Sequence, residues 1–192
     1  MSHPLRITQT LFDRVVGKKV TLDSVYREYR EPVLRYLTQL CGSADGAEDL
    51  TQETFVRVCT AFRSFRGESS LPTWLFRIAR NTYLNSVRRP DAARIATDEL
   101  LAIPDAHPYG DPVRQLASTE QRDVIALVLA QLPEKQRSIL LLRDSEDLAY
   151  AEIAEILDIS LAAVKVNIFR ARLAFRQIYA RYQTGGLSDA SL

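Results

Sequence analysis

The chain has 192 residues, 46% hydrophobic and 26% charged, which is the balance of a folded globular protein with room for one ordinary domain or two small ones. No stretch approaches the ~18–20 consecutive apolar residues of a membrane span. The first residues also lack the charged and apolar blocks of a signal peptide. The sequence therefore predicts no membrane insertion.

The residue types that build most cofactor and metal sites are scarce. Two cysteines are too few for a disulfide scaffold, which favours the reducing cytoplasm. His3 and His107 are far apart in the sequence, which argues against a zinc site. Neither a dinucleotide-binding glycine motif nor a P-loop occurs, and no nucleophile–base pair stands out. We expect no enzyme, no catalytic residue, no metal and no cofactor, and a cytoplasmic location.

Charge is divided unevenly along the chain, although the net charge is only +1. Segment 51–94 has eight arginines and three acidic residues, and segment 161–182 has five basic residues and no acid, so each carries +5. The acidic residues concentrate between these segments, from Asp98 to Asp158. Two basic segments around an acidic one indicate two contacts with a polyanion, the alternative being two solvated helix faces.

The first predicted elements are helices, because apolar residues recur every three or four positions and β-type alternation is absent. An N-terminal extension over 1–20 carries a short helix near 11–16. Thr21 then caps a helix that runs through Leu40, with Pro32 as a candidate kink and Gly42 as its stop.

Two more helices complete the N-terminal unit, which we predict to span 21–90. The third helix runs from about 47 to 62. The fourth runs from about 71 to 89, with Pro72 in its first turn and Pro90 at its end.

A proline-containing stretch of weak periodicity, 91–117, is predicted as a flexible linker. The second unit, 118–183, contains helices at about 118–131, 133–144, 149–157 and 161–181, followed by a flexible tail over 184–192. The predicted fold class is therefore all-α, with two small helical domains joined by a linker.

The last two helices have the spacing of a helix-turn-helix, with Ser160 as the cap of the second. A stripe along that second helix is predicted to be buried: Leu161, Val164, Ile168, Ala171, Phe175 and Ile178. The opposite face is a candidate major-groove surface made of Lys165, Val166, Phe169, Arg170 and Leu173. The alternative is that Val166, Phe169 and Leu173 form an apolar seam against another helix or a partner.

The fourth helix also carries a candidate nucleic-acid face, because Arg77, Asn81 and Arg88 share one side with Trp74 and Asn85 beside them. Arginine pairs with phosphates, asparagine reads base edges, and bases stack on an aromatic ring. Trp74 fits the core equally well. The loop before this helix adds further candidates, namely Arg63, Arg66, Ser69 and Ser70. Arg80 and Arg89 are interpreted as phosphate contacts or solvated charges.

The third helix has two faces of different character. Its predicted buried stripe is Phe55, Val58, Cys59 and Phe62, and both cysteines, Cys41 and Cys59, are expected to be small buried residues. Its polar face carries Asp49, Gln52, Glu53 and Arg57.

Two ordered sets of motifs resemble regions 2 and 4 of bacterial sigma factors of the extracytoplasmic-function (ECF) group. The first set is AEDLTQETF at 47–55, FRG at 65–67 and WLFRIARN at 74–81. The second set is LPEKQR at 132–137, YAEIAEIL at 150–157, VK at 164–165 and FRAR at 169–172. The resemblance covers about 21–89 and 118–181, and it implies a factor that binds core RNA polymerase and directs transcription initiation at promoters.

The resemblance also implies roles for the candidate faces. The polar face of the third helix would dock on the clamp helices of the polymerase β′ subunit, and region 4 would meet the β flap. The fourth helix and its loop would bind and melt the −10 element, with the loop capturing a flipped base, and the last helix would read the −35 element. An anti-sigma factor is implied as a further partner. The alternative function is a stand-alone helix-turn-helix regulator.

The chain departs from the family pattern in the helix that would read the −35 element. Leu161-Ala162-Ala163 stands where relatives often have small polar residues, and Lys165-Val166-Asn167 stands where they commonly have a basic–serine–arginine triplet. The AAC-like −35 preference of the family is therefore not carried over, and Val166 favours contact with a thymine methyl.

Overall fold

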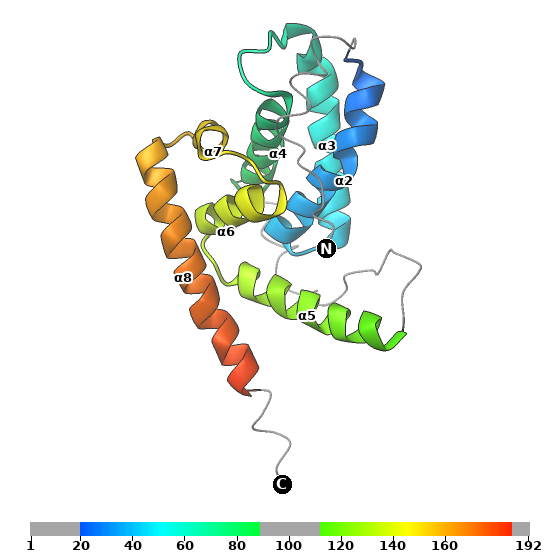
Figure 1. Ribbon diagram of the computed structural model, residues 1–192. Coiled ribbons are helices and arrows are strands. Elements are labelled where there is room, and N and C mark those ends of the chain that lie inside the picture. The colour runs from blue at the N-terminus through cyan, green and yellow to red at the C-terminus, as the bar shows by residue number, and fades with distance from the viewer. Residues whose placement is uncertain (1–19, 89–111, 186–192) are drawn as a thin grey trace.

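The computed structural model describes residues 20–88 and 112–185, and every regular element in these ranges is a helix (Figure 1). None of the described helices is both long and apolar enough to cross a bilayer. The predicted short helix near 11–16 lies outside the described residues. The described elements are α2 (Leu22–Cys41), α3 (Ala44–Ala61), η1 (Phe62–Ser64), α4 (Leu71–Arg88), α5 (Pro112–Ala130), α6 (Glu134–Leu140), η3 (Leu141–Ser145), α7 (Tyr150–Leu157) and α8 (Leu161–Gly185).

The boundaries of α2 follow from local chemistry that the sequence predicted. The Thr21 hydroxyl accepts a hydrogen bond from the Ser24 N–H, and the Ser24 hydroxyl accepts one from the Thr21 N–H. Gly42 ends the helix in the left-handed conformation, at φ 73°, which glycine adopts more readily than residues with a side chain. Pro32 lies inside the helix without interrupting it.

Helix α3 packs between α2 and α4, but its buried side differs from the predicted one. Phe55 and Val58 are buried, whereas Cys59 is exposed and Phe62 is only half-buried. The difference arises because Thr51 and Thr54 are buried too, and their hydroxyls donate to the carbonyls of Ala47 and Leu50, both at 2.7 Å. Because both threonine hydroxyls are hydrogen-bonded, these side chains can be buried, and the buried stripe of α3 therefore lies away from Cys59. Cys41 is half-buried.

The second group of helices departs from prediction at three boundaries. Helix α5 begins at Pro112 instead of 118, within the stretch predicted as linker. The helix predicted over 133–144 is instead α6 followed by the π-helical turn η3. Helix α8 continues to Gly185, into the predicted tail. Of its predicted buried stripe, Leu161 is exposed because it lies in the first turn, at the free end of the stripe.

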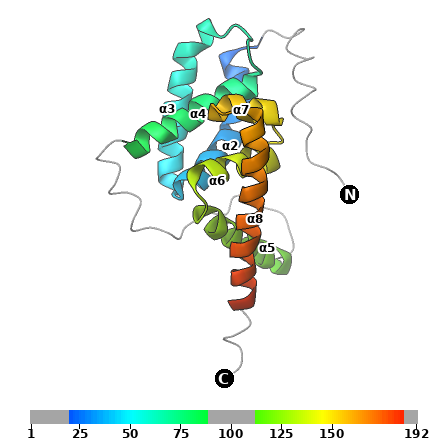
Figure 2. The ribbon, with the colours of Figure 1, turned by 90° about the vertical axis from the view of Figure 1, so that its left-hand side faces the viewer.

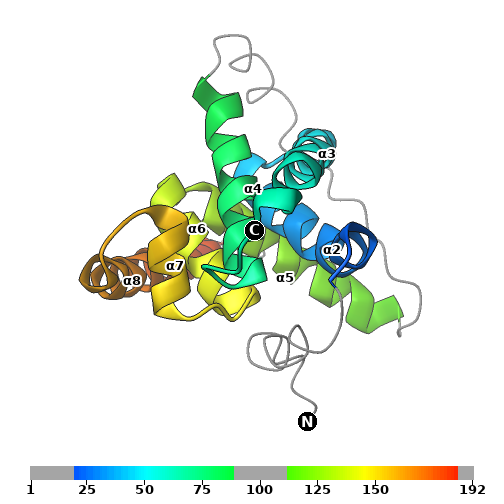
Figure 3. The same ribbon diagram turned by 90° about the horizontal axis from the view of Figure 1, so that it is seen from above.

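The two groups of helices pack together around one continuous hydrophobic core. Helix α4 lies along α7, and α2 contacts α5 and α6 (Figures 2 and 3). Tyr36 of α2 is fully enclosed between the groups. Its ring meets Phe76 edge-on with 5.4 Å between centroids, and its hydroxyl donates to Ser138 Oγ of α6 at 3.1 Å. The sequence did not predict how the two units sit relative to one another.

An ion pair crosses the same boundary. Arg80 of α4 donates from Nε and Nη2 to the two carboxylate oxygens of Glu134, both at 3.0 Å. The side chains are 9% and 27% exposed. Glu134 Oε1 also accepts from the Ser138 hydroxyl at 2.8 Å, which links the pair to Tyr36. Arg80 was predicted to be a phosphate contact or a solvated charge. It is instead a buried charge matched by a carboxylate of α6.

Removing one member of this pair is expected to destabilise the fold by more than the intact pair stabilises it, because the remaining charge is left without its partner. We predict that Arg80→Ala lowers the free energy of unfolding by about 2–3 kcal/mol, less than for a fully buried pair because water reaches Glu134. Urea denaturation of both single variants and of Arg80→Ala/Glu134→Ala tests this. The double variant should be more stable than the sum of the single losses predicts. Additive losses would contradict a direct coupling.

A second buried carboxylate lies beside a small cavity at the same boundary. Glu146 follows η3, and its buried side chain lies 3.7 Å from the guanidinium of Arg35 on α2. The cavity is lined by Glu28, Tyr29, Pro32, Pro72, Phe76, Glu146 and Leu148. Burial raises the pKa of Glu146 above its ordinary value, and the ion pair with Arg35 offsets only part of this shift.

The raised pKa of Glu146 makes stability depend on pH in a defined direction. The folded state favours the protonated carboxyl of Glu146. The stability that this proton contributes is complete below the ordinary glutamate pKa, and it is lost as the pH rises through the pKa of the folded state. Glu146→Gln should therefore be more stable than the parent chain at pH 7. The two should converge as the pH falls toward ~4.5. Thermal unfolding across this range checks it, and a variant less stable than the parent at pH 7 would refute it.

Candidate nucleic-acid interface

Helix α4 presents a continuous polar stripe on its outer face. Arg77, Asn81, Asn85 and Arg88 are all exposed. They are spaced four, four and three positions apart, which aligns them along one side of the helix. Two arginines therefore flank two asparagines along about three turns.

Trp74, which was predicted beside this stripe or in the core, is a core residue in the structure. Its side chain is only 9% exposed, and its ring centroid lies 6.5 Å from that of Phe62 and 4.9 Å from that of Phe65. The ring is therefore not available for base stacking in this conformation. It anchors the segment that connects η1 to α4.

Ser70, the last residue of the loop before α4, caps the N-terminus of that helix. Arg63 and Arg66 are exposed, and Ser69 is half-buried. The Ser70 hydroxyl accepts from the Thr73 N–H at 3.2 Å, the geometry of a helix N-cap. The same hydroxyl donates to Glu152 Oε1 of α7 at 2.6 Å, and the Thr73 hydroxyl donates to that oxygen at 3.1 Å.

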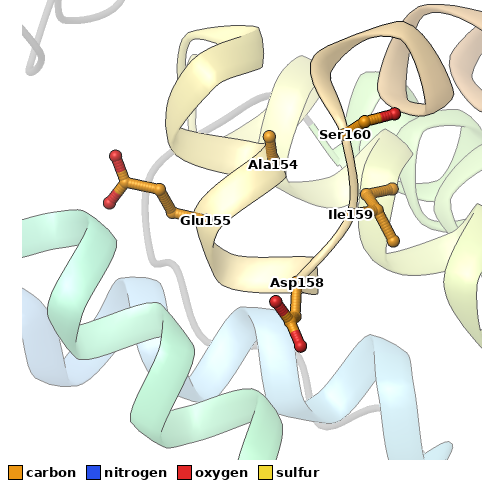
Figure 4. A pocket seen from close by; sticks show the side chains of 5 residues that line it. All are labelled: Ala154, Glu155, Asp158, Ile159 and Ser160. Carbon is orange, nitrogen blue, oxygen red and sulfur yellow. The ribbon is translucent and has the colours of Figure 1, made fainter.

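The turn between α7 and α8 has the predicted form. Asp158 ends α7 in the left-handed conformation at φ 52°, and Ser160 begins α8 by accepting from the Ala163 N–H at 3.1 Å. Figure 4 shows the open depression at this turn, where the carboxylates of Glu155 and Asp158 extend outward from the α7 side. The acidic groups of the motif thus lie before α8 and not on it.

Helix α8 exposes the whole face predicted to enter a groove. Lys165, Val166, Phe169, Arg170 and Leu173 are exposed, and Phe169 retains 67% of its accessible surface. Val164, Ile168 and Ala171 on the other side are buried against α6 and α7. The described part of the chain does not cover the three apolar side chains, so they form no seam against another helix of residues 20–88 or 112–185. A partner or DNA can reach them.

Helix α3 presents the remaining candidate face. Asp49 and Gln52 are exposed, and the partly exposed Glu53 and Arg57 form an ion pair of 2.6 Å one turn apart. Val56 lies between Gln52 and Glu53 around the helix and is 65% exposed. Sequence reasoning missed it, because an apolar residue in a helix is ordinarily assigned to the core. The sequence feature that could have identified Val56 is the position of an apolar residue among polar residues on one helix face.

Two family models match the chain, Sigma-70 region 2 over residues 25–93 and Sigma-70 region 4 over residues 122–175. The RNA polymerase sigma factor YlaC of Bacillus subtilis is 35% identical over 160 residues, which covers 82% of this chain and 91% of that protein. The ECF sigma-E factor of Escherichia coli is 33% identical over 174 residues, 86% and 91% of the two chains. The chain belongs to the ECF sigma factors.

Two solved structures share its fold. One is the sigma factor RpoE of Bartonella quintana in complex with the anti-sigma factor NepR, with a TM-score of 0.67, 22% identity and coverage of 81% of this chain and 94% of that one. The other is CnrH in complex with the cytosolic domain of CnrY, with a TM-score of 0.63, 19% identity and coverage of 88% and 94%. The predicted all-α fold with two sigma regions is confirmed.

Family membership settles the general function. As a sigma factor, the chain directs RNA polymerase to promoters. A stand-alone helix-turn-helix regulator is not favoured, because the N-terminal half is itself a sigma region and not an unrelated sensor or dimerisation unit.

Proposed function

We propose that this sigma factor reads a promoter with two separate helices, the −10 element with α4 and its preceding loop and the −35 element with α8. The observation that carries the proposal is the exposure of two basic faces, one with amides on α4 and one with apolar side chains on α8, on helices that belong to different sigma regions. Two such faces on one chain suit two sites on one polyanion.

At the −10 element, the stripe of α4 would hold a separated strand. Arg77 and Arg88 supply charge for phosphates, and Asn81 and Asn85 supply donors and acceptors for base edges. Arg63 and Arg66 extend the basic surface over the loop, where Ser69 and Ser70 offer short hydroxyls to a flipped base. Trp74 would support this loop from the core.

At the −35 element, α8 would lie in the major groove. Lys165 and Arg170 have the length and charge to reach phosphates or guanine edges, and Val166 and Phe169 suit thymine methyl groups. Leu173 extends the apolar part of the face. The absence of acids over 161–182 is consistent with approach to a duplex.

Core RNA polymerase would dock on the α3 face formed by Asp49, Gln52, Glu53 and Arg57, and we add Val56 to this set. A face with two acids would repel DNA, so a protein surface such as the β′ clamp helices suits it better. An exposed aliphatic residue ringed by polar side chains is a common anchor of such interfaces. Region 4 would contact the β flap.

We assign region 2 to 21–90, region 4 to 118–183 and a linker between them, with the helical structure of α5 reaching into that linker. An anti-sigma factor is a proposed further partner. The similar Bartonella protein was solved with one, and the apolar side chains of the α8 face suit a protein ligand. We place the protein in the cytoplasm, where it would act as a polymerase subunit without cofactor, metal or catalytic centre.

The test is run-off transcription with purified core polymerase and a library of candidate promoters, with binding to core measured separately by co-elution. The parent chain should bind core and start transcripts from a subset of templates. Val56→Glu should weaken core binding by roughly tenfold, because it puts a charge at the centre of the docking face.

Val87→Glu is the matched control for this experiment. Val87 on α4 is 60% exposed, close to the 65% of Val56, so the same substitution has a similar local cost. It should leave core binding in the absence of DNA unchanged. Equal weakening by both variants would place the docking face elsewhere, and a parent chain that neither binds core nor starts RNA would refute the proposed function.

The exposed position of Val166 gives a second prediction. Val166→Ser replaces methyl contact with a hydroxyl, so it should change the −35 sequence preference. Its effect on the free energy of unfolding should stay within about 0.5 kcal/mol, because the side chain is exposed. Promoter-library selection with both proteins checks this, and identical sequence logos would refute a role for Val166 in reading DNA.

A further inference from the structure

An ion pair lies at the edge of the α8 face that is proposed to read the −35 element. Arg172 donates from Nη2 to one carboxylate oxygen of Asp144 at 2.6 Å and from Nε to the other at 3.5 Å. Asp144 belongs to the turn η3, so the pair joins α8 to a different element of the same sigma region. The two side chains are 43% and 47% exposed, which leaves the pair open to an approaching ligand.

The position of Arg172 on α8 places it beside the residues of that face. It follows Lys165 by seven positions and Phe169 by three, and seven positions are nearly two full turns, so the three residues share one side of the helix. The neighbouring Ala171 is buried. Arg172 therefore lies where the exposed face meets the buried side, and it extends the row of basic groups that begins at Lys165. The predicted −35 face did not include it.

A carboxylate and a phosphate compete for a guanidinium, because both present oxygen atoms that accept two parallel N–H hydrogen bonds. An exposed ion pair is weak in water and is screened by salt, so a phosphate at the edge of the groove can displace Asp144 from Arg172. The exchange is less favourable than binding to an unpaired arginine, since the existing pair must break and the carboxylate then repels the phosphate.

We infer that Asp144 is a positioning residue for Arg172 and that its carboxylate withholds one phosphate contact from the −35 duplex. The inference rests on the proposed function, because that function brings DNA to α8. Asp144 itself reads no base. It acts through Arg172, so it sets the affinity and the salt dependence of duplex binding and leaves the −35 sequence preference to the other residues of the face.

The experiment uses the full chain with Asp144→Asn, and Asp147→Asn as the matched control. Asp147 is 57% exposed and lies in the same segment, but it pairs with Arg143 at 3.3 Å. Arg143 lies against the start of α7, where it donates to the Leu148 carbonyl and its guanidinium is 5.5 Å from the centre of the Tyr150 ring. Asparagine tolerates the positive φ of Asp147 as aspartate does, so each variant removes one charge at little other cost.

The readout is the affinity for a short duplex of random sequence, measured by fluorescence anisotropy between about 50 and 200 mM salt. Asp144→Asn should bind roughly three- to tenfold more tightly at ~0.1 M salt, and its plot of log affinity against log salt should be steeper by about 0.9, the value for one added phosphate contact. Asp147→Asn should leave the slope unchanged. A substitution that only loosened α8 would weaken binding, so the sign of the change separates the two roles.

The double variant Asp144→Asn/Arg172→Gln tests whether the gain passes through Arg172. It has the net charge of the parent chain and no guanidinium at this position, so it should return to about the parent affinity and slope. No gain in Asp144→Asn, an equal gain in Asp147→Asn, or a gain that persists in the double variant would overturn the inference.

Promoter-library selection completes the test. Asp144→Asn should select the same −35 sequences as the parent chain, and a changed sequence logo would contradict action through a phosphate contact. The duplex measurement needs no polymerase, so the two proposals can fail separately. A chain that shows the gain but starts no RNA with core polymerase refutes the proposed function, and an active chain without the gain refutes only the role of Asp144.

Discussion

A guanidinium inside a hydrophobic core is tolerated only when its charge is matched, and Arg80 is matched by a carboxylate 54 positions further along the chain. This pair, extended through Ser138 to Tyr36, is one of the polar contacts that fix how the two sigma regions sit together on their shared core. Without Glu134, the Arg80 guanidinium would face either water or a cavity with no opposite charge. The arrangement of the two regions is thus specified by a few polar contacts within a larger apolar boundary.

The same helices that build the core also present the functional faces. Helix α4 buries Leu75, Phe76 and Ala79 on one side and displays cations and amides on the other. Helix α8 likewise buries Val164 on one side and exposes Phe169 on the other. Because each reading face belongs to a rigid helix, the spacing within a face is fixed. The spacing between the two faces depends on how the two regions sit together.

Helical periodicity and capping chemistry were enough to predict most of the local structure. Thr21 and Ser160 cap as expected, because an N-cap depends only on neighbouring backbone groups. The exposed stripes of α4 and α8 were predicted from helical periodicity, which determines which side chains share one side of a helix. Cys59 was misplaced because periodicity does not distinguish a buried threonine with a satisfied hydroxyl from an exposed one.

The closure of the two regions was beyond sequence reasoning. Glu134 and Glu152 look like ordinary solvated charges near helix N-termini, and their partners lie about 50 to 80 positions away. Trp74 was undecided between core and surface, because one helix face can border both. Val56 was overlooked because apolar character alone indicates burial. In each case the missing information was which helix covers the residue.

The central claim is that the two sigma regions pack on one another through the Arg80–Glu134 pair and the core around it. The direct measurement is energy transfer between dyes at Arg27→Cys and Gln177→Cys, both exposed positions, in a chain whose two native cysteines are replaced by serine. The account predicts efficient transfer in the free protein, because both dyes lie on regions that share one hydrophobic core. Low transfer in the free chain would contradict it.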